Sequence, residues 1–261
     1  MMNALWVSKT GLNAQDHGLS VISNNLANVA TTGFKKDRAV FEDLIYQIQR
    51  QPGALSSQDS RLPSGLQIGT GVKVAGTQKI FTTGGLQETS QPLDMAINGR
   101  GFFQITMPDG SISYTRDGTF HMDAEGQIVN ASGFLLEPAI TIPDQTNTMT
   151  ISRDGIVSTT LFGETEPTEI GQIEIVDFIN PAGLQAMGGN LFLETASSGA
   201  PQAGVASEAG YGSMEQGFLE NSNVNVVEEM VQMITVQRAY EMNSKVVSSA
   251  DQMLQYLAQN T

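Results

Sequence analysis

Histidines and carboxylates are the first candidates for chemistry in this chain, because acid, base and metal chemistry depends on them. His17 and His121 are the only histidines. A serine, His121 and Asp117 could form a catalytic triad on paper, but no Gly-x-Ser-x-Gly turn accompanies them. Residue types alone occur in such combinations by chance in most proteins, so we expect no enzyme activity.

Metal and phosphate sites have little support in the sequence. Asp123 and Glu125 lie beside a glycine but lack the spacing of an EF-hand calcium loop, which favours an ordinary turn. Gly69 and Gly71 lack the third glycine of a dinucleotide-binding loop. The absence of cysteine excludes disulfides, thiolate nucleophiles and cysteine-ligated metal sites. We therefore expect no metal and no cofactor.

Charge is distributed unevenly along the 261 residues, which include 27 acidic and 13 basic ones. Residues 101–220 hold 16 acids and only two bases, Arg116 and Arg153, so the net charge of −14 lies in this window. The acidic total argues against nucleic acid as a partner. No apolar run approaches the about 18 residues of a membrane span. Either the acids decorate a soluble domain, or they separate an acidic surface from a neutral contact region.

An apolar stripe with a seven-residue period runs from about Asn3 to Val29. It consists of Leu5, Leu12, Leu19 and Leu26, joined by Ile22 and Val29. This spacing predicts a long amphipathic helix that stops at Thr31–Gly33. Lys9, Asp16 and His17 interrupt the stripe. We therefore expect this amino-terminal segment to belong to the mature structure and not to be a signal peptide.

A second stripe predicts a helix from Asn225, as N-cap, to about Ala258. Its seven-residue series is Val226, Met233, Tyr240, Val247 and Leu254, widened by Met230, Val236, Ala250 and Leu257. Neither stripe can be buried by its own helix. We therefore expect the two terminal helices to pair as a coiled-coil stalk and to pack their remaining apolar width against other copies.

The centre of the chain changes to short strand-like runs separated by glycine turns. Ile, Val, Phe, Tyr and Thr are frequent in these runs, which predicts an all-β domain over 93–194. Residues 31–92 and 195–224 are rich in small and polar residues and predict extended connectors to the helices of 1–30 and 225–261. The expected fold class is α+β, with a helical stalk, connectors and a central all-β domain. This pattern suits a radial building block of a tubular polymer.

Several motifs resemble those of the bacterial flagellar rod and hook proteins. Ile22–Lys35 resembles the amino-terminal signature of this family, and Ser222–Met230 with Gln237–Glu241 resembles the carboxyl-terminal one. Gly99–Phe103 and Tyr114–Gly118 resemble its central domain. The resemblance therefore covers essentially the whole chain.

Two further segments, Gln51–Ala54 and Leu62–Gly71, are similar to the distal-rod members of the family. In those members the stretch after the first helix, here about 46–66, is associated with a straight and rigid rod. The residues expected to stiffen the rod are Tyr46, Gln51, Pro52, Gly53, Leu62, Pro63 and Leu66. An ordered stretch that bridges protomers would favour a distal rod, whereas a disordered linker would leave a proximal-rod or hook subunit open.

The resemblance implies a structural subunit that the flagellar type III export apparatus secretes unfolded and uncleaved. The family's terminal helices form an inner tube around the export channel, and its β domain forms the outer shell. Such a rod spans the periplasm to the outer membrane and transmits motor torque to the hook. The implied partners are other copies of the chain, the proximal-rod proteins, the hook protein, the rod cap, and the P and L ring proteins acting as a bushing.

The expected self-assembly surface joins both stripes to the motif after the first helix. Asn24, Asn25 and Asn28 could fix register by bonds between protomers, or could be solvated amides at a helix end. Gly33 and Phe34 could form a hinge with an aromatic anchor, or a helix stop beside a core phenylalanine. The full set is Leu5, Leu12, Leu19, Ile22, Asn24, Asn25, Leu26, Asn28, Val29, Gly33, Phe34, Val226, Met230, Met233, Tyr240, Val247, Leu254 and Leu257.

Overall fold

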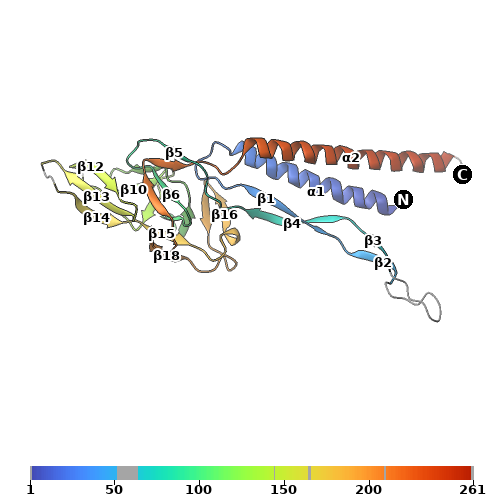
Figure 1. Ribbon diagram of the computed structural model, residues 1–261, viewed down its shortest axis with the longest axis horizontal. Coiled ribbons are helices and arrows are strands. Elements are labelled where there is room, and N and C mark those ends of the chain that lie inside the picture. The colour runs from blue at the N-terminus through green and yellow to red at the C-terminus, as the bar shows by residue number, and fades with distance from the viewer. Residues whose placement is uncertain (1, 52–63, 144, 164–165, 209, 260–261) are drawn as a thin grey trace. The chain divides into compact units, whose positions relative to one another are not determined.

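The computed structural model describes residues 2–51, 64–143, 145–163, 166–208 and 210–259. A helix at each end and a strand-rich centre make the fold α+β, as the sequence predicts (Figure 1). The chain divides into two compact units. We call residues 1–27, 37–78 and 225–261 the helical unit, and residues 28–36 and 79–224 the β unit.

Two long helices, α1 (Met2–Ala27) and α2 (Val226–Gln259), form the larger part of the helical unit. They run side by side in opposite directions (Figure 1). Asn225 caps α2, because its Oδ1 accepts hydrogen bonds from the N–H groups of Val227 at 3.1 Å and Glu228 at 3.4 Å. No helix in the described part of the chain combines the length and apolarity that a membrane crossing requires.

Two strand pairs complete the helical unit. Strand β1 (Asp37–Asp43) pairs with β4 (Val72–Lys79), and β2 (Tyr46–Arg50) pairs antiparallel with β3 (Leu66–Gly69). Strand β1 contacts α1, and the Thr10 hydroxyl of α1 accepts a hydrogen bond from the Val72 N–H at 3.3 Å. The segment expected to be a connector thus contains paired strands, which satisfy the backbone hydrogen bonds of an otherwise polar stretch.

The β unit contains a seven-stranded sheet in the order β16-β17-β8-β7-β11-β10-β9. Its strands are β7 (Phe103–Thr106), β8 (Ile112–Thr115), β9 (Phe120–Met122), β10 (Ile128–Asn130), β11 (Leu135–Glu137), β16 (Gln185–Gly188) and β17 (Leu191–Leu193). A three-stranded sheet consists of β12 (Thr146–Ile151), β13 (Ile156–Leu161) and β14 (Thr168–Gln172). Neighbouring strands in both sheets pair antiparallel, which suits the short glycine turns between them.

Three further pairs bring distant parts of the chain together. The pairs are β6 (Met95–Asn98) with β19 (Ser213–Gln216), β5 (Leu86–Glu88) with β20 (Phe218–Glu220), and β15 (Glu174–Asp177) with β18 (Gln202–Val205). A short 3-10 helix spans Pro181–Gly183. The β unit therefore includes strands on both sides of the 93–194 range that the sequence suggested for a β domain.

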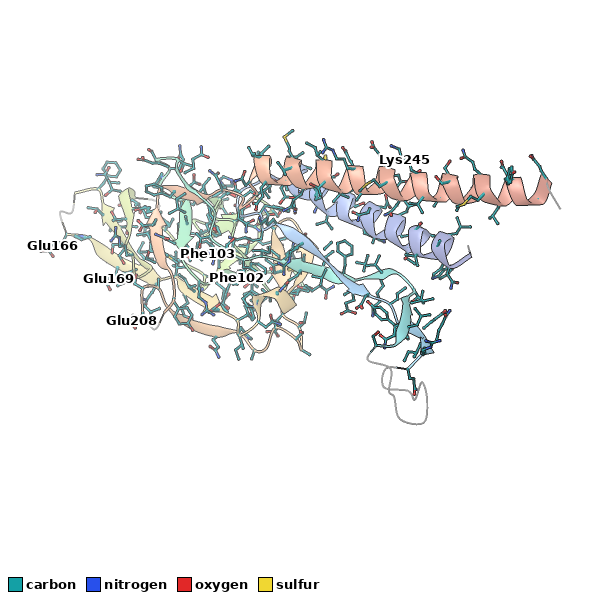
Figure 2. The ribbon with its side chains drawn as sticks, turned by 45° about the vertical axis from the view of Figure 1, so that its right-hand side comes forward. Phe102, Phe103, Glu166, Glu169, Glu208 and Lys245 are labelled. Atoms are coloured by element: carbon teal, nitrogen blue, oxygen red, sulfur yellow. The ribbon has the colours of Figure 1, made fainter. Side chains whose placement is uncertain are left out.

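Two apolar cores lie in the β unit, and adjacent phenylalanines point into different ones. Phe103 packs edge-on against Phe120, with ring centroids 5.2 Å apart, while Phe102 faces Phe178 at 5.9 Å. Successive side chains of an extended backbone point to opposite sides. Phe102 and Phe103, labelled in Figure 2, therefore join the two cores.

Candidate assembly surfaces

The contacts between α1 and α2 repeat every seven residues along both helices. Asn25 Nδ2 lies 3.2 Å from Glu229 Oε2. Seven residues away on each helix, a methyl group at Gly18 would lie 3.9 Å from Val236 Cγ1. After another seven, a methyl group at Gly11 would lie 2.9 Å from Asn243 Nδ2. Both helices therefore present one continuous face to each other, in antiparallel register.

Two glycines of α1 lie at this contact. Gly11 and Gly18 lie against α2, and Ser8 and Ala14 are further small residues of α1 that are buried. Small side chains let two helix backbones approach closely. Leu5, Leu12, Leu19 and Leu26 are all half-buried, whereas Ile22 is 6 % exposed.

Asn25 connects three elements of the helical unit. Its Oδ1 accepts a hydrogen bond from the Asp37 N–H at 2.9 Å, and its Nδ2 donates to the Asp37 carbonyl at 2.8 Å and to Glu229. Asn25 and Glu229 are each 2 % exposed. The amide therefore sets the positions of α1, β1 and α2 within one protomer. Asn24 is exposed, and Asn28 accepts a hydrogen bond from Thr31 Oγ1 at 3.2 Å.

A second apolar surface lies on the side of α2 away from α1. Its first turns expose 71 % of Val227, 51 % of Met230, 58 % of Val231 and 48 % of Ile234. We call these four residues the outward patch. They are spaced three and four residues apart, so they share one side of the helix. Helix pairing uses the opposite side of α2, so α1 leaves the outward patch exposed.

The other residues of α2 predicted to take part in self-assembly are half-buried or exposed. Val226, Tyr240 and Leu254 are exposed by about two-fifths, and Met233 and Val247 are half-buried. The side chain of Leu257 lies outside the described part of the chain. Met242, Val246 and Met253 are exposed, and Lys245 is labelled on α2 in Figure 2.

The β2–β3 hairpin presents a third apolar surface. Ile45, Tyr46, Ile48 and Leu66 are exposed by 86, 49, 56 and 52 %, and Gln51 is exposed as well. The other residues predicted to stiffen the rod, Pro52, Gly53, Leu62 and Pro63, lie outside the described residues. The flanks of the 46–66 stretch are thus paired strands with apolar side chains on the surface.

Gly33 and Phe34 belong to the β unit. The Gly33 N–H donates to the Glu220 carbonyl at 2.7 Å, and its φ of +68° is one that glycine adopts without strain. Phe34 is buried, with Lys79 Nζ 5.3 Å from its ring centre. Val29, at the end of the first stripe, is half-buried.

Residues considered for chemistry take part in turns. Asp117 Oδ1 accepts hydrogen bonds from the Thr119 N–H and hydroxyl at 3.1 and 2.7 Å. Asp123 accepts one from the Glu125 N–H at 3.0 Å, and a hydrogen bond between the two carboxyl groups lowers the pKa of Asp123 and raises that of Glu125. His121 is exposed on β9. Within the described ranges, no three His, Asp or Glu side chains are grouped as metal ligands.

The charges that residues 101–220 expose differ from those that counting their acidic and basic residues suggests. Of its two basic residues, Arg116 is buried and only Arg153 is largely exposed. Glu166, Glu169 and Glu208 are exposed on the β unit (Figure 2). Glu220, which pairs with Arg116, is buried too, so Arg153 is the one basic side chain that the described part of residues 101–220 exposes.

Models of three protein families match this chain. Residues 5–35 match "flagella basal body rod protein", residues 96–159 match "flagellar hook protein FlgE/F/G D1 domain", and residues 215–260 match "flagellar basal body rod FlgEFG protein C-terminal". Together with full-length relatives, these matches show that the chain belongs to the flagellar basal-body rod protein family. It is a structural subunit of the basal-body rod, where it assembles with other rod and hook components.

Relatives from several bacteria align with nearly the full length of the chain. It is 54 % identical to the flagellar basal-body rod protein FlgG of Buchnera aphidicola from Schizaphis graminum, over 99 % of this chain and 100 % of that one. Identity to the FlgG of Borreliella burgdorferi is 50 %, over 97 % of each chain. Identity to the FlgG of Bacillus subtilis is 37 %, over 98 % of each. The expectation of a flagellar rod subunit is confirmed.

Proposed function

We propose that this chain polymerises into the distal part of the flagellar rod, a straight hollow tube that transmits motor torque to the hook and encloses the export channel. The outward patch of α2 carries this proposal. A helix with apolar side chains on two opposite sides needs partners on both, and α1 occupies one. Other copies of the chain provide the second partner.

The inner tube consists of the two terminal helices, over 1–30 and 225–261, paired as a coiled coil. The seven-residue steps from Asn25 to Gly11 and from Glu229 to Asn243 support this pairing, because a seven-residue contact period is the mark of coiled coils. The β unit, which contains the expected β domain over 93–194, forms the outer shell. The expected connectors, 31–92 and 195–224, contribute strands to the two units and join the two layers where the chain passes between the units.

The β2–β3 hairpin bridges neighbouring protomers and stiffens the tube. Its support is the exposed apolar side chains of Tyr46, Ile48 and Leu66 on a narrow strand pair that leaves them uncovered, with Ile45 exposed just before β2. A bridging hairpin favours the distal rod over a proximal-rod or hook subunit, since extra contacts between protomers resist bending.

The activity of the chain is mechanical, without catalysis. Its neighbours in the basal body are the proximal-rod proteins, the hook protein, the rod cap during assembly and the export apparatus. The P and L ring proteins surround it as a bushing. The turn roles of Asp117 and Asp123 support this proposal, because both carboxylates are occupied by backbone hydrogen bonds.

Genetic complementation with cross-linking tests the proposal. A flagellated bacterium lacking its own distal-rod gene should regain motility and complete basal bodies when it produces this chain. The chain contains no cysteine, so in a double variant with Val231→Cys and Ile48→Cys only the two introduced thiols can form disulfide cross-links. A ladder of cross-linked protomers is expected from the double variant, and neither single variant should give one. Failure of the unmodified chain to restore basal bodies would contradict the proposal.

A further inference from the structure

The chain crosses between the two units four times, and these crossings involve only three segments of the β unit. The crossings lie between residues 27 and 28, 36 and 37, 78 and 79, and 224 and 225. On the β-unit side they belong to the segments 28–36, 79–85 and 218–224. We call these the linking segments. Any load carried along the chain from one unit to the other must pass through them.

A buried carboxylate connects the three linking segments. Glu220 Oε1 accepts hydrogen bonds from Lys35 Nζ at 2.7 Å and from the Gly84 N–H at 2.8 Å. Lys35 Nζ also donates to the Thr82 carbonyl at 2.8 Å. The side chains of Lys35 and Glu220 are 0 and 1 % exposed. Each linking segment therefore contributes a group to one charged cluster shielded from water.

Arg116 attaches this cluster to the body of the β unit. Its Nη1 lies 3.3 Å from Glu220 Oε2 and 3.2 Å from the Ile97 carbonyl, and its Nη2 donates to the Gly99 carbonyl at 2.6 Å. Two cations thus share one carboxylate, and burial lowers the pKa of Lys35 and of Arg116, opposed by the charge of Glu220. Removing that single anion would leave two buried cations uncompensated.

Asn223 makes a second connection among the same segments. Its Oδ1 accepts a hydrogen bond from the Lys36 N–H at 2.8 Å, and its Nδ2 donates to the Ile80 carbonyl at 2.8 Å and to Thr82 Oγ1 at 3.0 Å. Backbone bonds from Gly33 to Glu220 and from Ile80 to Lys36 add to it. Two side chains three residues apart therefore hold all three linking segments together.

We propose that Glu220 and Asn223 clamp the three linking segments into one rigid body, and that this clamp carries torque between the two units of the assembled subunit. The torque-bearing role rests on the proposed function, whereas the clamp itself does not. Separate peptide linkers would twist independently under load. Because Glu220 and Asn223 hold the three linking segments together through ion pairs and hydrogen bonds, the segments resist load as one body.

Hydrogen–deuterium exchange of the purified full-length protein tests the clamp. Glu220→Gln replaces one carboxylate oxygen by an NH2 group that faces N–H donors, so all three linking segments should exchange roughly 100-fold faster, while β7 and β8 stay unchanged. Glu169→Gln, the same change at an exposed position, is the matched control and should have no effect. Acceleration confined to 218–224 would overturn the clamp.

Asn223→Ala gives an independent test that leaves the charged cluster intact, and it replaces Glu220→Gln should that variant not fold. Exchange in 28–36 and 79–85 should accelerate about tenfold. Asn221→Ala, at an exposed residue two positions away, is its control. Unchanged exchange in both segments would overturn the role of Asn223.

The torque-bearing role requires a readout under load. Cells whose rods contain Asn223→Ala should assemble normally in dilute medium but shed hook–filament structures as medium viscosity increases. Wild-type and Asn221→Ala cells should not shed them. Equal shedding with accelerated exchange would refute the torque role and leave the clamp. Failure of the unmodified chain to complement would instead refute the proposed function, with the exchange results unaffected.

Discussion

Replacing Ile234 in the outward patch should weaken assembly without unfolding the protomer. Ile234 is 48 % exposed, so about half of its side chain remains to be covered. Full burial of an isoleucine is worth about 1.5–3 kcal/mol, so assembly gains about 1 kcal/mol at this residue. Ile234→Ala should raise the concentration required for assembly roughly fivefold. Ile234→Asp also brings a carboxylate into an apolar contact and should raise it by more than about 100-fold.

Sedimentation of the purified protein over a range of concentrations measures this effect, and circular dichroism checks the fold. Ser244→Asp introduces the same charge at an exposed α2 position outside the outward patch and is the matched control. Val236→Asp lies on the α1-facing side and should instead disrupt helix pairing in the monomer. Assembly of Ile234→Asp at the wild-type concentration would refute the reasoning.

Three further predictions concern the stability effect of two glycine substitutions, the pH dependence of stability, and the order in which a protease cleaves the two units. Gly71→Ala should destabilise the protein by about 2 kcal/mol in urea unfolding, because Gly71 has a φ of +124° and its new methyl group would clash with Thr10. Gly18→Ala should instead stabilise α1 by up to about 1 kcal/mol, because its methyl group would make only ordinary contacts, with Phe41 and with Val236 of α2. Equal effects of the two substitutions would contradict this. Burial raises the pKa of Tyr114 above 10.0, so its contribution to stability is present below pH 10 and is lost as pH rises through the folded-state value. Tyr114→Phe should therefore flatten the loss of unfolding free energy above pH 10, and parallel curves would count against it. Brief proteolysis of the monomer should cleave the helical unit before the β unit, because the apolar surfaces of the former are uncovered, and the reverse order would be inconsistent with that view.

Periodicity in the sequence predicted the elements but not their closest contact. The expected helix over about Asn3–Val29 corresponds to Met2–Ala27, and Asn225 was recognised as the cap of α2. The apolar period of α1 follows the leucine series, whereas Gly18 and Gly11 lie against α2. A glycine produces no hydrophobic signal, so only the backbone distance reveals its role.

Long-range partnerships could not be predicted from local patterns. Lys35 and Glu220 are 185 residues apart in the chain, and charged residues are usually placed at the surface by default. The pairing of β5 with β20 is similarly remote. For neither pairing does the sequence contain a turn motif or a periodic pattern that would link the two positions. The strand pairs within 37–79 were missed because their composition is that of a polar connector.

Electron microscopy of the concentrated, purified protein tests the central claim most directly. A distal-rod subunit with an uncovered outward patch and an exposed hairpin should form straight tubes with a central channel. Curved or supercoiled tubes would contradict the stiffening role of the hairpin. Monomers at every concentration, both alone and on added basal bodies that end at the proximal rod, would contradict self-assembly.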